Sequence, residues 1–132
     1  METNYLCPKC LGYLNVGDSL IFSAKARNNV KGLILLSQKL GIYEVKKHPS
    51  FIYNEGELVE FFCPICHENL NCVKNDKLAR VLMIDEKGNE FKVVFSRIAG
   101  EKSTYTITGD NVEMYGEHSG HYIDLLHMIQ SM

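Results

Sequence analysis

The sequence predicts a mainly β protein of the α+β class, with a β-meander and one short C-terminal helix. Short β-rich runs separated by turn residues fill most of the 132 residues, and a helical stripe appears only near the end. Apolar residues make up 45% and charged residues 23%, which is ordinary for a globular chain. The longest apolar runs are Leu33 to Leu36 and Val81 to Ile84, far shorter than the roughly 20 residues of a membrane-spanning helix. We therefore expect a compact protein without a membrane partner.

Several short strands are expected in the first half. The second half of residues 19–27 alternates apolar and polar side chains, as a half-buried strand does. The run Leu33 to Leu36 has the length of a buried strand, and the following residues 38–41 are compatible with one helical turn closed by glycine. Ile42 to Lys46 favours another strand, which ends at His48-Pro49.

The second half predicts a meander. Residues 78–84 and 91–97 are β-rich runs on either side of Asp85-Glu86-Lys87-Gly88-Asn89, a good hairpin turn. Thr104 to Thr108 is a third strand, and Gly109-Asp110 turns the chain into Val112 to Tyr115.

The chain end has a different period. Tyr122, Leu125, Leu126 and Ile129 are spaced i, i+3, i+4 and i+7, which predicts a short amphipathic helix with Ser119 as its N-cap. We place a boundary near residues 73–77, so that residues 1–74 form one cysteine-bearing β unit. Residues 75–132 form the meander with its helix, packed on the first unit.

Two cysteine pairs share one spelling, Cys7-Pro8-Lys9-Cys10 and Cys63-Pro64-Ile65-Cys66. Two thiolates separated by two residues can reach one metal ion from a tight turn, and the proline presets φ for that turn. Four sulfurs complete the tetrahedral shell of a structural zinc site. An apolar residue, Leu14 or Leu70, stands four positions after each pair.

These two pairs resemble the knuckles of the zinc-ribbon (rubredoxin-like) family, in which two hairpin turns clamp one zinc ion. The resemblance covers about 16 residues and implies Cys7, Cys10, Cys63 and Cys66 as the metal ligands. This chain departs from the family's pattern at Leu11 and His67, because many ribbons have glycine directly after the second cysteine. The 52 residues between Cys10 and Cys63 also form a long insertion, which must contain strands of its own.

Other uses of the cysteine pairs fit the sequence less well. A thioredoxin-like pair begins a helix, and neither pair here is followed by a helical stripe. An iron-loaded, rubredoxin-like electron carrier is compatible with four thiolates, since the ligand set alone does not separate zinc from iron. A closed shell of four thiolates leaves no open position for catalysis, so we expect no enzyme.

The remaining candidate ligands favour ordinary roles. Cys72 is unpaired and is expected to be a small buried hydrophobe, with the role of a fifth sulfur as the alternative. His67 follows a ligand and is expected outside the metal shell. His118, His121 and His127, together with Asp124, could form a second metal or acid–base site, but they match no metalloenzyme motif, and we expect surface histidines.

The charges are uneven. The net charge is −2, yet the 25–48 segment has six basic residues and only Glu44 as an acid, a net charge of +5 that leaves −7 for the rest. The aromatic residues in or near it, Phe22, Tyr43, Phe51 and Tyr53, could stack on bases, which makes a nucleic-acid-binding ribbon the alternative reading. Solvated strand faces explain the same lysines without any partner.

The sequence thus predicts a small zinc-binding protein with a structural four-cysteine site, acting as a non-enzymatic interaction or regulatory module with a protein partner. The alternatives are a nucleic-acid-binding ribbon that uses the 25–48 segment and an iron electron carrier. The first residues show neither a basic nor an apolar leader region, so we expect a cytoplasmic location.

Overall fold

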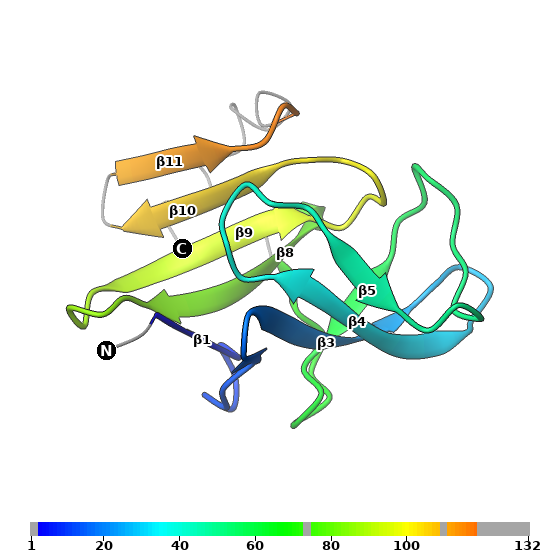
Figure 1. Ribbon diagram of the computed structural model, residues 1–132, viewed down its shortest axis with the longest axis horizontal. Coiled ribbons are helices and arrows are strands. Elements are labelled where there is room, and N and C mark those ends of the chain that lie inside the picture. The colour runs from blue at the N-terminus through cyan, green and yellow to red at the C-terminus, as the bar shows by residue number, and fades with distance from the viewer. Residues whose placement is uncertain (1–2, 73–74, 109–110, 119–132) are drawn as a thin grey trace.

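The computed structural model describes residues 3–72, 75–108 and 111–118. These residues form eleven β-strands in two antiparallel sheets. Figure 1 shows β8 to β11 side by side in one sheet and β3 to β5 in the other.

The smaller sheet contains five strands in the order β2-β3-β4-β5, and β6 also pairs with β3. Its strands are β2 (Asn15–Val16), β3 (Ser19–Lys25), β4 (Lys31–Ser37), β5 (Val45–Lys47) and β6 (Glu60–Phe62). The strands β2 and β6 lie along the same edge of β3, since β2 pairs with residues 19–20 and β6 with residues 23–25. The alternating sequence of β3 turns Leu20, Phe22 and Ala24 into the core, as its pattern predicts.

The larger sheet contains six strands in the order β1-β8-β9-β10-β11, and β7 also pairs with β8. Its strands are β1 (Asn4–Leu6), β7 (Asn71–Cys72), β8 (Asn75–Ile84), β9 (Glu90–Ser96), β10 (Thr104–Thr108) and β11 (Asn111–Tyr115). The last four strands form the antiparallel meander expected from the sequence. The β8–β9 turn is closed by Asp85, whose carboxylate accepts the backbone N–H groups of Lys87 at 2.9 Å and Asn89 at 2.8 Å. The bond from Asn89 has the largest effect, and together the two bonds lower the pKa of the Asp85 carboxyl.

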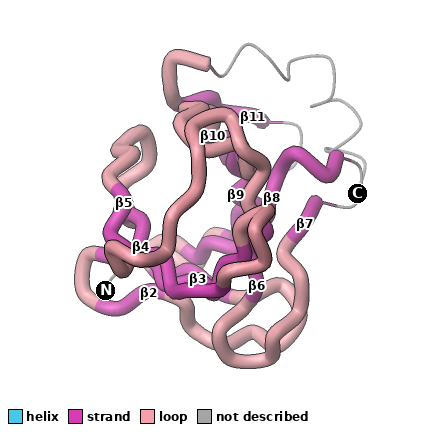
Figure 2. The backbone as a smooth tube through the Cα atoms, turned by 90° about the vertical axis from the view of Figure 1, so that its right-hand side faces the viewer, coloured by secondary structure: helices cyan, strands magenta, loops and turns pink. Residues whose placement is uncertain are grey.

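The predicted α+β class is wrong. The described part of the chain is all-β, and Figure 2 shows strands and loops with no helix among these residues. The described residues thus include no helix long and apolar enough to cross a membrane. The C-terminal helix was predicted at residues 119–129, which lie outside the described residues.

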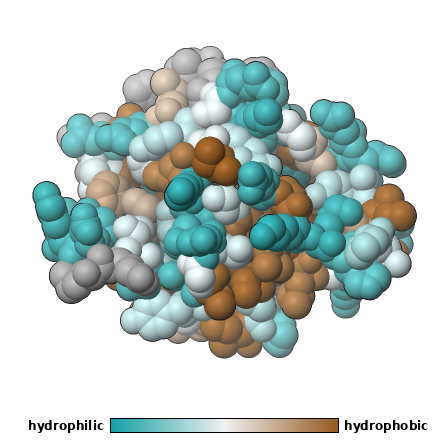
Figure 3. Space-filling view, in the orientation of Figure 1, coloured by the Kyte–Doolittle hydropathy of each residue, from teal (hydrophilic) through white to brown (hydrophobic). Residues whose placement is uncertain are grey.

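Three smaller expectations for the first half also need correction. The strand predicted at Ile42 to Lys46 is limited to β5, while residues 42–44 are irregular. The run Leu33 to Leu36 is part of β4, but only Ile34 is fully buried and Leu33 is 54% exposed. One face of β4 covers the core and the other faces out. Figure 3, in the orientation of Figure 1, shows an apolar area over the lower centre of the molecule. No helical turn forms at residues 38–41.

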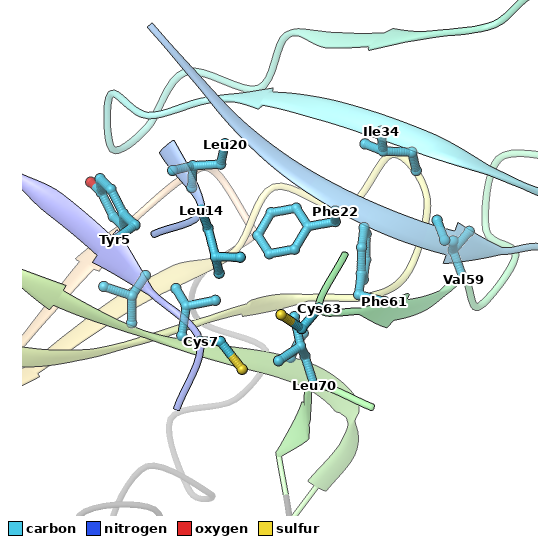
Figure 4. Close-up of a cluster of buried hydrophobic side chains, with 14 of the residues drawn as sticks. Tyr5, Cys7, Leu14, Leu20, Phe22, Ile34, Val59, Phe61, Cys63 and Leu70 are labelled. Carbon is cyan, nitrogen blue, oxygen red and sulfur yellow. The ribbon is translucent and has the colours of Figure 1, made fainter. Parts of the chain in front are cut away.

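The two sheets share one apolar core. Phe22 of β3, Phe61 of β6 and Phe95 of β9 make three mutual ring contacts, with centroids 5.4 to 5.7 Å apart. Phe95 comes from the larger sheet and the other two rings from the smaller one, so this trio joins the layers. Figure 4 shows Phe22 and Phe61 inside the buried cluster. A second cluster, made of Cys72, Leu78, Val94, Tyr105 and Ile107, includes residues on the other face of the larger sheet.

The division at residue 74 stays a prediction. Strands β1 and β7 precede it in the chain, yet both pair with β8, which follows it. The main core also draws residues from both sides, including Phe22 and Val93.

The aromatic trio predicts a large effect of Phe22→Ala. Phe22 has no exposed surface, so its truncation leaves a cavity between the sheets and is expected to lower the free energy of unfolding by about 3–5 kcal/mol. Urea unfolding followed by circular dichroism measures the loss. The control is Ile52→Ala, which removes a 60% exposed side chain and should change stability by less than about 0.5 kcal/mol. Similar losses in both variants would contradict the assigned core.

Candidate metal centre

The two Cys-Pro-x-Cys motifs form turns with the same hydrogen bonds. The backbone N–H of Cys7 donates to the carbonyl of Gly12, and that of Cys63 donates to the carbonyl of Glu68, each at 3.0 Å. In the reverse direction, the N–H groups of Leu11 and His67 donate to the carbonyls of Cys7 and Cys63, each at 2.9 Å. The two knuckles are therefore the same local structure, repeated 56 residues apart.

Backbone amides in both turns point at the first sulfur of the pair. Lys9 N–H lies 3.3 Å from Cys7 Sγ, and Ile65 N–H lies 3.3 Å from Cys63 Sγ. The N–H of Gly12 adds a contact of 3.4 Å to Cys10 Sγ. Such N–H donors stabilise negative charge on sulfur, which a metal-binding thiolate requires.

Each knuckle carries the chain from one sheet to the other. The first knuckle joins β1 of the larger sheet to β2 of the smaller sheet, and the second joins β6 of the smaller sheet to β7 of the larger sheet. Matching bonds close the two hairpins, from Leu14 N–H to the Tyr5 carbonyl at 2.8 Å and from Leu70 N–H to the Phe61 carbonyl at 2.9 Å. Leu14 and Leu70, the apolar residues shared by both motifs, are each 1% exposed and anchor the hairpins in the core.

This arrangement brings together the four cysteines singled out in the sequence, Cys7, Cys10, Cys63 and Cys66. Their sulfur atoms all lie within 4.8 Å of one another. Two sulfur pairs that bridge the knuckles, Cys7 with Cys66 and Cys10 with Cys63, are each 3.8 Å apart. A tetrahedral ion with metal–sulfur bonds of about 2.3 Å separates its ligands by about 3.8 Å, whereas a disulfide needs about 2.0 Å. The spacing fits a shared metal ion and excludes disulfides.

The centre lies half inside the protein. Cys7 and Cys63 have no exposed surface, Cys66 is half-buried, and Cys10 is exposed. Figure 4 shows Cys7 and Cys63 within the buried cluster, with Leu70 beside Cys63. Burial raises the pKa of the Cys7 thiol to about 12, so a metal ion must displace this proton when it binds.

Leu11 and His67 take the left-handed backbone conformation that glycine has in many ribbons. Their φ angles are +60° and +67°, a region that costs a non-glycine residue roughly 1–2 kcal/mol. Leu11 and His67 in place of glycine thus keep the shape of the turns, and the free-energy cost of the substitution is backbone strain at these two residues.

The other candidate ligands lie apart from the cysteine cluster. Cys72 is 1% exposed and belongs to the second apolar cluster, as expected for a small hydrophobe. His67 is exposed, and the cluster contains cysteines alone. His118 contacts the 102 region, where its Nδ1 accepts the Lys102 N–H at 2.9 Å. His121, Asp124 and His127 lie outside the described residues.

The aromatic residues proposed for base stacking are largely unavailable. Phe22 and Phe51 are 0% and 2% exposed. Tyr53 packs edge-on against Phe51, and Lys47 Nζ lies 5.1 Å from the centre of the Tyr53 ring. Lys25 forms an ion pair with Glu60 at 3.4 Å. Part of the basic segment is thus engaged within the fold.

Sequence reasoning missed how the two knuckle tips meet. A Cβ atom built on Gly12 would lie 2.5 Å from Ile65 Cδ1, so glycine lets the end of the Ile65 side chain approach the first knuckle closely. Around the contact, Leu11, Tyr13 and Ile65 remain 58%, 66% and 56% exposed. The sequence did contain a signal for this contact. Turns ordinarily favour polar residues and glycine, so apolar residues inside both turn motifs indicate that the tips contact something.

The backbone strain predicts that Leu11→Gly stabilises the protein. Glycine accepts the φ of +60° without a steric cost, so the free energy of unfolding is expected to rise by about 1 kcal/mol. Chemical unfolding measures the difference. The control is Val16→Gly, which removes a 65% exposed side chain from β2 and should lower stability by about 0.5–1 kcal/mol. A loss of stability in Leu11→Gly would show that the leucine side chain outweighs the strain.

No family model, curated protein or solved structure matches this chain, so the four-cysteine geometry itself is the basis for a functional argument.

Proposed function

We propose that Cys7, Cys10, Cys63 and Cys66 bind one zinc ion in a structural site, and that the protein is a non-enzymatic interaction or regulatory module. The single observation that carries the proposal is the pair of 3.8 Å sulfur–sulfur distances across the knuckles. This distance is the tetrahedral edge expected for about 2.3 Å bonds.

The position of the site supports a structural role for the metal. Four thiolates complete the coordination shell and leave no position for a water molecule or a substrate. The ion would join the two turns at which the chain passes between the sheets. The binding free energy of the metal would then stabilise the fold, as it does in other small metal-bound domains.

The surface around the centre supports an interaction role. The exposed side chains of Leu11, Tyr13 and Ile65 are apolar and lie at or beside the meeting knuckle tips. Exposed apolar groups that cluster on a rigid support are typical of protein contact sites. We therefore propose this tip patch, Leu11, Tyr13 and Ile65, as the surface that meets a protein partner.

The proposed site predicts the metal content of the protein. Protein purified under reducing conditions should contain about one metal ion per chain, and a strong chelator should unfold it. Cys10→Ser removes an exposed ligand and should abolish stoichiometric metal while costing little core packing. Cys72→Ala is the matched control, because Cys72 lies outside the cluster, and it should keep its metal.

Elemental analysis and absorption spectra separate the candidate metals. A colourless protein with zinc supports the proposal, whereas a red, reversibly reducible protein with iron supports the electron carrier. Reduced protein without metal, or Cys10→Ser with full metal, would defeat the four-cysteine site.

The proposed contact surface predicts how a substitution in the tip patch changes partner binding. Ile65→Asp places a charge at the patch and should weaken a specific partner complex by tenfold or more, since apolar anchors dominate such contacts. Affinity isolation from native extract, followed by titration of the recovered protein, measures the loss. Ile52→Asp is the control, because Ile52 is similarly exposed, at 60% against 56% for Ile65, but lies in the connection between β5 and β6. Equal effects of both substitutions would reject the patch.

A further inference from the structure

The smaller sheet has an outer face that carries both apolar and basic side chains. In β3, the residues that alternate with the buried Leu20, Phe22 and Ala24 point away from the core. The strand register extends this outer face across β6, β4 and β5. Figure 3 shows apolar groups over the part of the molecule where Figure 1 draws β3 and β4.

Residues paired across the strands divide the outer face into three rows. The first row contains Glu60, Lys25 and Lys31, the second Phe62, Ser23 and Leu33, and the third Ile21, Leu35 and Lys46. Neighbouring rows are two residues apart along a strand, which is a distance of about 6.7 Å. The first row is thus charged, and the other two are mainly apolar.

The second row forms a shallow depression with a volume of about 610 Å³. The small side chain of Ser23 lies between the larger Phe62 and Leu33, which pair with it from either side. Leu33 is 54% exposed, so its side chain is accessible to a partner. An apolar side chain placed over Ser23 would be buried between two apolar walls, as interface anchors commonly are.

One end of the depression carries excess positive charge. Its described lining includes Lys25, Lys31 and the imidazole of His67, and no carboxylate. The two lysines are directly opposite each other in the β3–β4 register, an arrangement of like charges that destabilises a sheet. Lys25 forms a 3.4 Å ion pair with Glu60, whereas no described carboxylate forms an ion pair with Lys31. An anionic group between the lysines would offset their repulsion.

The composition of the rows favours a peptide over other occupants. Nucleic-acid bases stack on aromatic rings, and the three rows contain one such ring, that of Phe62. A symmetric contact with a second copy would bring one positive face against another. A membrane contact buries side chains that protrude, whereas the middle of this face is hollow.

We propose that the outer face binds an extended acidic segment of a partner protein, in which a carboxylate is followed at alternate positions by two apolar side chains. Alternate side chains of an extended segment point the same way and are about 6.7 Å apart, which matches the spacing of the rows. The segment runs antiparallel to β3, with its carboxylate beside Lys31 and its first apolar side chain over Ser23. Its second apolar side chain then covers Ile21 and Leu35.

This surface extends the proposed interaction role, and in that respect it rests on the proposed function. None of its rows contains a sulfur ligand or a residue of the tip patch. The outer face is tested with synthetic peptides, and the tip patch with a partner isolated from extract. Failure of one test therefore leaves the other, and the metal analysis, unaffected.

Two matched peptides test the proposal. The first is a blocked peptide with Glu-Thr-Leu-Thr-Leu at its centre, and in the second the Glu is replaced by Lys. Each is titrated into the full-length, as-purified protein while backbone amide shifts are followed by NMR. The Glu peptide should shift residues of β3, β4 and β6 and bind about tenfold more tightly than the Lys peptide. Added salt should reduce this difference.

Three results would overturn the proposal. One is the absence of shifts on the outer face at millimolar peptide concentration, and another is equal binding of the two peptides. The third is tighter binding of oligothymidine, or of vesicles that contain phosphatidylserine, to the same residues, because the face would then serve a different class of partner.

A charge reversal assigns the carboxylate contact. Lys31→Glu should weaken binding of the Glu peptide by about tenfold, and the variant should fold because a carboxylate opposite Lys25 replaces repulsion with attraction. Lys39→Glu is the matched control, since it changes the net charge equally at an exposed lysine outside the rows. It should alter binding by less than about twofold. Equal losses in both variants would reject the assigned contact.

A truncation checks the depression. Leu33→Ser removes one apolar wall and should weaken binding of the Glu peptide by about fivefold. Ile52→Ser removes a similarly exposed side chain, 60% against 54%, away from the outer face and should leave binding unchanged. Full binding by a folded Leu33→Ser protein would place the peptide elsewhere and refute the proposed site.

Discussion

The contact between the two cysteine knuckles is the constraint on which the rest of this small β protein depends. Each knuckle is the point where the chain leaves one sheet for the other, and the two crossings run in opposite directions. The four sulfur atoms at these crossings lie within 4.8 Å of one another. The intervening strands β2 to β6 therefore form a loop whose two ends meet at one place. A metal ion bound by the four sulfurs would stabilise this arrangement in the folded protein, and such binding helps most where the core is small.

The core extends this constraint across the molecule. Strands β1 and β7 lie end to end along β8, and β2 and β6 lie end to end along β3. Each long strand thus holds one short strand from each knuckle. The rings of Phe22, Phe61 and Phe95 then fix the distance between the sheets. Beyond this trio the sheets enclose a cavity, and the same strands that lead into the knuckles provide part of its wall.

The knuckles contain two local costs, which a bound ion would help to offset. Leu11 and His67 are held in left-handed conformations, and burial raises the pKa of the Cys7 thiol to about 12. Four sulfurs held at ligand spacing, with N–H groups directed at three of them, are an arrangement that favours thiolates and hence a cation. The strain is local, whereas an ion shared by the two knuckles would stabilise the connections between both sheets.

The local chemistry of this protein was readable from its sequence, and its long-range placement was not. Two identical Cys-Pro-x-Cys motifs identify the cysteines that come together, because their meaning depends on a few adjacent residues. The alternation of β3 and the Asp85 to Asn89 turn are local for the same reason.

The expectation of an α+β fold was wrong. It depended on the periodicity of residues 119–129, whereas the described part of the chain is all-β. Periodicity likewise could not show that Leu33 faces outward, that Phe22 and Phe51 fill the core, or that β1 pairs with β8. Those outcomes depend on contacts between residues far apart in the chain. Only tertiary packing decides them, because burial of a side chain is determined by which surfaces the two sheets present to each other.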